Sequence, residues 1–159
     1  MSAFDFGFTT IDGKPMPLET YQGKVLLVVN VASHCGLTPQ YEGLEALSQQ
    51  YRDQGLVVIG VPANDFGKQE PGTEQEIKTF CTTRFSVDFP LASKEQVIGG
   101  EAHPFYKWAV AKLGEDAAPK WNFHKYLIGK DGSIAGVFGS RTVPDAPDLV
   151  QAVEAALAP

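Results

Sequence analysis

The sequence contains only two cysteines, Cys35 and Cys81, and has no long uncharged apolar run. A secreted scaffold held by disulfides needs more cysteines, and intracellular thiols are usually reduced. No stretch reaches the roughly 18 apolar residues of a membrane span, and Met1 to Gly7 lack the pattern of a signal peptide. We therefore expect a soluble, cytoplasmic protein without integral membrane contact, whose two cysteines are either packing residues or redox groups.

Positive charge is also scarce. The 13 Lys and Arg residues are outnumbered by 19 Asp and Glu residues, which gives a net charge of −6, and no basic run is present. Nucleic acid is therefore not an expected partner, and neither is an anionic membrane surface. The three histidines do not have the spacing of a zinc site, so we expect no metal. The length of 159 residues, without repeats or linkers, predicts one domain over residues 1–159.

One apolar run organises the rest of the chain. Val25 to Val31 is β-branched or aliphatic except at Asn30, as in a buried strand, and residues 39–51 carry apolar residues at helical spacing after Pro39. Cys35 therefore lies in the turn between a strand and a helix. Chemistry usually collects at such strand ends in open α/β sheets, and the positive end of a helix dipole favours a thiolate.

The other elements follow from the same patterns. An N-terminal hairpin is expected around residues 11–14, and the apolar run at 56–61 makes a parallel strand after the first helix. The remaining predictions are a loop at 62–72, a helix opened by the capping box at Thr73 and ending near Thr83, a short strand within 85–92, a helix at 104–113, a hairpin of 125–128 with 133–138, and a helix at 147–157. This order is the thioredoxin-like α/β plan, a central mixed β-sheet flanked by helices with an N-terminal β-hairpin.

Cys35 has two readings on residue chemistry alone. Free cysteine is among the most buried residue types and often only packs. Its position favours a reactive thiol, since the turn is expected to be exposed and Gly36 leaves one side of the backbone open.

Three segments together resemble the glutathione peroxidase family. They are NVASHCG at 30–36, PANDFGKQEPG at 62–72 and KWNF at 120–123, and they stand in the order and at the separations found in that family. The similarity extends from about residue 4 to 157. The resemblance implies a thioredoxin-like fold and the reduction of hydrogen peroxide or organic hydroperoxides.

The resemblance also implies roles that the residue chemistry supports. Cys35 would be the nucleophile, whose thiolate attacks the terminal peroxide oxygen and becomes a sulfenic acid. The indole N–H of Trp121 and the side-chain amide of Asn122 are hydrogen-bond donors suited to a thiolate and a departing oxygen anion. Without the resemblance, Trp121 would read as a core residue.

Asp65 is a departure from the pattern, because the resemblance implies at this position a glutamine that is hydrogen-bonded to the reactive sulfur. An ionised carboxylate only accepts hydrogen bonds and would oppose thiolate formation. Three alternatives stay open: Asp65 turns toward the Trp121 indole, stays protonated, or accepts the thiol proton. We predict a supporting or proton-handling role rather than direct donation to sulfur.

Cys81 is either a small apolar filler or a second redox residue. IKTFC at 77–81 with VDFP at 87–90 resembles the resolving-cysteine segment of the thioredoxin-dependent, cysteine-type members. The resemblance implies a Cys35–Cys81 disulfide that thioredoxin reduces. Because a disulfide needs Cα atoms within about 7 Å, we expect the Cys81 helix to unwind locally.

The resemblance further implies no bound cofactor, an external thiol as reductant, and a monomer, because the insertion linked with tetramers is absent. The alternatives are a glutathione-dependent peroxidase, a peroxide sensor that oxidises a partner protein, a thiol-disulfide oxidoreductase, or an inert binding module. The oxidoreductase usually requires Cys-X-X-Cys, whereas Thr38 stands at the last place here.

Overall fold

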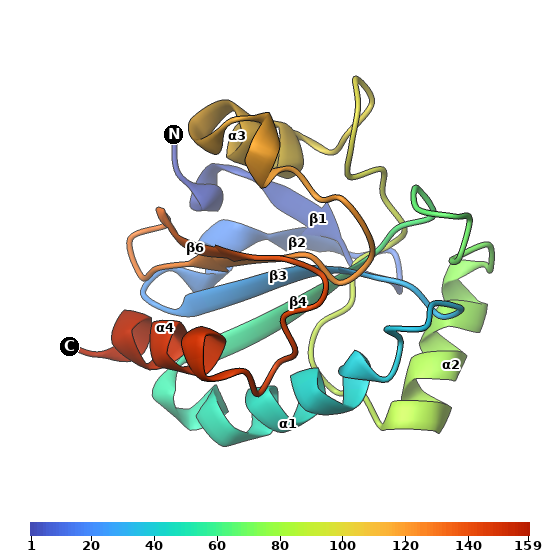
Figure 1. Cartoon of the computed structure of the whole chain (residues 1–159), viewed down its shortest axis with the longest axis horizontal. Coiled ribbons are helices and arrows are strands. Elements are labelled where there is room, and N and C mark those ends of the chain that lie inside the picture. The colour runs from blue at the N-terminus through green and yellow to red at the C-terminus, as the bar shows by residue number, and fades with distance from the viewer.

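The computed structural model describes residues 1–159. The centre of the protein is a four-stranded mixed sheet in the order β4-β3-β5-β6. β3 (Val25–Val31) pairs in parallel with β4 (Leu56–Pro62) and antiparallel with β5 (Lys125–Ile128). β6 (Ile134–Phe138) completes the sheet by pairing antiparallel with β5. The mixed sheet with helices on its faces confirms the predicted thioredoxin-like fold (Figure 1).

Every residue of β3 is buried because both faces of the sheet are covered. Successive side chains of a strand point to opposite faces. Val25, Leu27 and Val29 pack in one hydrophobic cluster with α1 (Gln40–Tyr51) and α4 (Pro147–Leu157). Leu26 and Val28 pack in a second cluster with α3 (Pro104–Leu113) and the N-terminal hairpin. Figure 1 shows α1 and α4 below the sheet and α3 above it.

The N-terminal hairpin is a separate two-stranded antiparallel sheet of β1 (Gly7–Thr9) and β2 (Pro15–Pro17), as predicted. Short 3-10 helices occupy Ala3–Asp5, Leu18–Tyr21, Arg52–Gln54 and Glu115–Ala117. None of the helices has both the length and the apolar composition needed to cross a bilayer.

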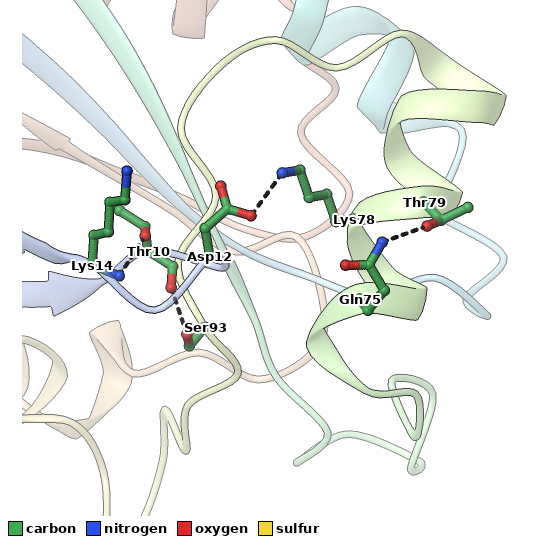
Figure 2. A network of polar contacts seen from close by, with 7 residues as sticks. All are labelled: Thr10, Asp12, Lys14, Gln75, Lys78, Thr79 and Ser93. Atoms are coloured by element: carbon green, nitrogen blue, oxygen red, sulfur yellow. Dashed lines mark hydrogen bonds and ion pairs between the residues drawn. The ribbon is translucent and has the colours of Figure 1, made fainter.

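α2 (Glu74–Phe85) carries Cys81 and packs against the core through Ile77, Cys81 and the partly buried Phe80 and Phe85. It begins at the predicted capping box of Thr73 with Glu76, but it buries only Ile77 and Cys81. Figure 2 shows the ion pair of 2.6 Å between Lys78 and Asp12, which ties α2 to the hairpin turn. Both side chains are about half exposed, and such surface pairs contribute little to stability.

The predicted strand within residues 85–92 is wrong. α2 continues to Phe85 and ends at Ser86, which has a left-handed conformation with φ of 52°. Only two isolated bridges follow, from Leu91 to Gly60 and from Ala92 to Thr10. Pro90 has no N–H with which to extend a ladder along β4, so the segment contacts the sheet edge without becoming a strand.

Candidate active site

The Cys35 sulfur is fixed in the turn that precedes α1. The Cys35 N–H donates to Thr38 Oγ1 at 2.9 Å, and the Thr38 hydroxyl donates to the Ala32 carbonyl at 2.8 Å. The Leu37 N–H donates to Cys35 Sγ at 3.3 Å. Thr38 therefore closes the turn, and a backbone donor points at the sulfur, where it stabilises negative charge.

Cys35 opens into a cavity of about 440 Å³. The lining residues are Cys35, Gly36, Leu37, Gln69, Trp121, Ser140 and Arg141. The structure thus brings together two of the predicted site residues, Cys35 and Trp121, from segments far apart in the sequence. Cys35 is 9% exposed and Trp121 is 37% exposed, so a small molecule in the cavity reaches both.

Asn30 on β3 holds the segment that carries Trp121 and Asn122. Asn30 Nδ2 donates to the Trp121 carbonyl at 3.1 Å, and the Phe123 N–H donates to the Asn30 carbonyl at 2.6 Å. Phe123 is fully buried with φ of 65°, a conformation that a bulky residue adopts only when its surroundings impose it. This role of Asn30 was not predicted from the sequence, although a polar residue inside an apolar strand was an available signal.

Gln69 is a second residue that the sequence analysis missed. It lines the Cys35 cavity, and its Oε1 accepts a hydrogen bond of 2.9 Å from Asn122 Nδ2. The loop reaches this place through two left-handed residues, Gly67 and Lys68. A Cβ on Gly67 would lie 3.0 Å from the Trp121 ring, so the backbone passes closely under the indole. Asn122 is fully buried and does not itself line the cavity; its side-chain amide N–H binds Gln69 Oε1 instead.

Asp65 does not lie at the Cys35 cavity, which corrects its predicted role. Asp65 Oδ2 accepts hydrogen bonds from the Val97 N–H at 2.6 Å and the Ile98 N–H at 3.3 Å. Its side chain lines a separate polar cavity. The left-handed residues between Asp65 and Gln69 turn the chain, so the two side chains face different cavities. The amide side chain that lines the Cys35 cavity is that of Gln69.

Cys81 is a free thiol, fully buried on α2. Burial raises the pKa of this thiol to about 11, which the neighbouring Tyr41 hydroxyl partly offsets. Cys35 is also a free thiol and belongs to the same hydrophobic cluster. The residues next to the two cysteines touch, since the rings of His34 and Phe80 have centroids 6.3 Å apart.

No group of three or more His, Cys, Asp or Glu side chains is placed to hold a metal ion. The histidines are used separately in packing. The His103 ring stacks on Phe8 and contacts the Gly7 carbonyl at 2.9 Å. Burial lowers the pKa of His124 to about 4, so this ring is neutral at pH 7.

Comparison with known proteins decides the family. Residues 3–110 match the sequence profile of the glutathione peroxidases. The chain belongs to the glutathione peroxidase family. It is 51% identical over 149 residues to the hydroperoxy fatty acid reductase Gpx2 of Synechocystis sp., covering 94% of this chain and 95% of the relative. It is 41% identical over 170 residues to the thioredoxin/glutathione peroxidase BtuE of Escherichia coli, covering 93% of each.

A solved relative has the same fold. The crystal structure of T. cruzi GPX1 is 33% identical and superposes with a TM-score of 0.77, covering 99% of this chain and 97% of the other. The predicted family, the predicted fold and the predicted peroxidase class are thereby confirmed.

Proposed function

We propose that this glutathione peroxidase reduces hydroperoxides with Cys35 as the nucleophile. The thiolate attacks the terminal peroxide oxygen, the O–O bond breaks, and an alkoxide or hydroxide departs with a proton as alcohol or water. Cys35 becomes a sulfenic acid. The observation that carries this proposal is the common cavity of Cys35, Gln69 and Trp121.

Two hydrogen-bond donors are placed to stabilise the negative charge as it moves from the Cys35 sulfur to the departing oxygen. Gln69 Oε1 is occupied by Asn122, so the Gln69 Nε2 group is free to donate into the cavity. The Trp121 indole N–H is a donor only, and its ring lines the same cavity. Donors fixed in advance stabilise a developing oxygen anion more effectively than mobile water does.

In the second step Cys81 attacks the Cys35 sulfenic acid, forming a disulfide and releasing water. Cys81 is sealed in the core, so α2 has to open locally for the sulfurs to meet. Two features of α2 support such opening: it buries only two residues, and its ion pair to Asp12 is exposed. Segments with few buried contacts open at low free-energy cost. The contact between His34 and Phe80 also holds the segments of Cys35 and Cys81 next to each other before α2 opens.

Thioredoxin is the proposed reductant of this disulfide, by thiol exchange, and no bound cofactor is required. The name of the E. coli relative supports thioredoxin with glutathione as the alternative, and the name of the Synechocystis relative supports fatty acid hydroperoxides as substrates. We further propose a monomer in the cytoplasm, where both free thiols stay reduced.

A coupled assay tests the proposal. Purified protein is supplied with NADPH, thioredoxin reductase and thioredoxin, or with NADPH, glutathione reductase and glutathione, and with hydrogen peroxide or a fatty acid hydroperoxide. We expect continuous NADPH oxidation with thioredoxin, none with Cys35→Ser, and loss of thioredoxin-dependent turnover with Cys81→Ser. If NADPH oxidation stops after one equivalent of peroxide per protein with both peroxides, an enzymatic role is contradicted.

A further inference from the structure

The Cys35 cavity is lined by one cationic side chain and by no carboxylate. Of the seven residues that line it, only Arg141 is a charged residue. Neither of the two ion pairs in the protein includes Arg141, so its guanidinium has no carboxylate partner within the protein. The whole chain has a net charge of −6, which disfavours the approach of an anion. The cavity is therefore a local exception, at which a negatively charged group can bind.

The turn that carries Arg141 is held from inside the protein. It follows β6 directly, and both Arg141 and its neighbour Ser140 line the cavity. The Ser140 carbonyl accepts a hydrogen bond of 2.7 Å from Gln40 Nε2. Gln40 is the first residue of α1, the helix that begins just after the Cys35 turn. The turn after β6 and the Cys35 segment are therefore tied to each other.

Lys125 completes this connection from β5. Its Nζ donates to Gln40 Oε1 at 2.7 Å and lies 3.5 Å from the Gly139 carbonyl oxygen and 3.4 Å from that of Ser140. Lys125 is fully buried and Gln40 is 7% exposed, so water hardly competes for these bonds. A buried ammonium whose partners are all neutral oxygens is costly, so a lysine here calls for an explanation beyond stability. Its effect is to fix the two carbonyl groups that precede Arg141.

We propose that Arg141, positioned by the buried Lys125, binds the carboxylate of a hydroperoxy fatty acid and so selects the free acid over its esters. This inference rests on the proposed peroxidase function and names the substrate group that the cavity recognises. A guanidinium presents N–H donors in a planar fork that matches the two oxygens of a carboxylate. Leu37 and Trp121 offer apolar surface in the same cavity for the hydrocarbon chain next to the peroxide group, which reacts with Cys35.

The exposure of Arg141 sets the size of the expected effect. The side chain is open to solvent, so its attraction to a carboxylate is weakened by water and by salt. An ion pair at such a site increases binding by about fivefold at most. An ester of the same fatty acid has the same chain and the same peroxide group but no negative charge. The ratio of the two rates therefore isolates the contribution of Arg141.

The test compares a hydroperoxy fatty acid with its methyl ester before any reductant takes part. Reduced protein is mixed with either compound, below the concentration at which the compound aggregates, and Cys35 oxidation is followed by stopped-flow tryptophan fluorescence. In the wild type we expect the free acid to react about fivefold faster than the ester at low salt, and the ratio to approach 1 at about 1 M salt. In Arg141→Gln we expect a ratio of about 1 at every salt concentration. Lys112→Gln removes an exposed cation from the last turn of α3, outside the cavity, and keeps the wild-type ratio.

Lys125→Met tests the positioning of Arg141. We expect this substitution to lower the ratio toward 1 in the wild-type background and to change it no further in Arg141→Gln, because both residues act on the same contact. A general structural defect slows the acid and the ester equally and leaves the ratio unchanged. An unchanged ratio in folded Lys125→Met therefore overturns the positioning role of Lys125.

The surface variant Arg141→Gln decides the proposal even where the buried Lys125→Met fails to fold. A wild-type ratio of about 1 at low salt, or equal ratios in the wild type and Arg141→Gln, overturns the inference alone. Failure of hydrogen peroxide, the free acid and the ester to oxidise Cys35 in the wild type overturns the proposed function as well.

Discussion

Replacing Asp65 by alanine separates a structural role from a catalytic one. The variant loses the acceptor of the 2.6 Å hydrogen bond from the Val97 N–H, and Val97 is 1% exposed. The second bond, from the Ile98 N–H, is longer at 3.3 Å, and Ile98 is 38% exposed, so water replaces it. A hydrogen bond to a charged group contributes about 1.5–3 kcal/mol. We therefore expect the free energy of unfolding to fall by about 2 kcal/mol, or Tm by about 4–8 °C.

Peroxide reduction should barely change in the same variant. Because Asp65 lines a different cavity from Cys35, the rate of Cys35 oxidation, measured by stopped-flow tryptophan fluorescence at a temperature where both proteins are folded, should stay within about twofold. Asp65→Asn keeps an acceptor oxygen and should lose about half as much stability. A large loss of rate with an unchanged Tm would refute the reasoning and restore a catalytic role for Asp65.

Three further predictions address the site and its buried charges. Gln69→Ala should slow Cys35 oxidation by about 10²-fold because it removes a donor from the cavity, and it should also lower Tm because the buried Asn122 Nδ2 loses its acceptor. A normal rate in stopped-flow would exclude the donor role of Gln69. The pKa of Glu70 is raised to about 7, so the native protein binds the extra proton and wild-type stability falls as pH rises from about 4.5 to 7. The free energy of unfolding of Glu70→Gln, measured by denaturant titration, should therefore exceed that of the wild type at pH 8 by up to about 3 kcal/mol. At pH 4.5 it should not exceed it. Burial lowers the pKa of Lys125 to about 7, so this group makes stability rise with pH above 7; Lys125→Met should flatten that rise between pH 7 and 9, and an unflattened curve would contradict it.

The fold was predictable from the sequence where local chemistry and burial agree. β3 is apolar at almost every position because both of its faces are covered, and that pattern identified it directly. The Thr73 capping box placed the start of α2 correctly. The segment at 85–92 failed because alternation alone does not show whether a neighbouring strand offers a complete ladder. Here Ser86 and Pro90 break the pairing.

The place of the candidate site was predictable where the strand and helix patterns fix it, as for Cys35 in the turn between β3 and α1. It was not predictable where a loop decides which side chain enters the cavity. Gln69 and Asp65 are four residues apart, and the left-handed conformations of Gly67 and Lys68 determine that the former faces Cys35. Lys68 carries no sequence signal for such a conformation. The role of Asn30 likewise depends on contacts with residues about 90 positions away.

The most direct test of the account is intact mass spectrometry after one equivalent of hydrogen peroxide on the wild type, Cys35→Ser and Cys81→Ser. We expect loss of two hydrogen atoms in the wild type, a sulfenic acid trapped by dimedone in Cys81→Ser, and no change in Cys35→Ser. An unmodified wild type, or oxidation of Cys35→Ser at the wild-type rate, would contradict the central claim that Cys35 is the peroxide-reducing thiol.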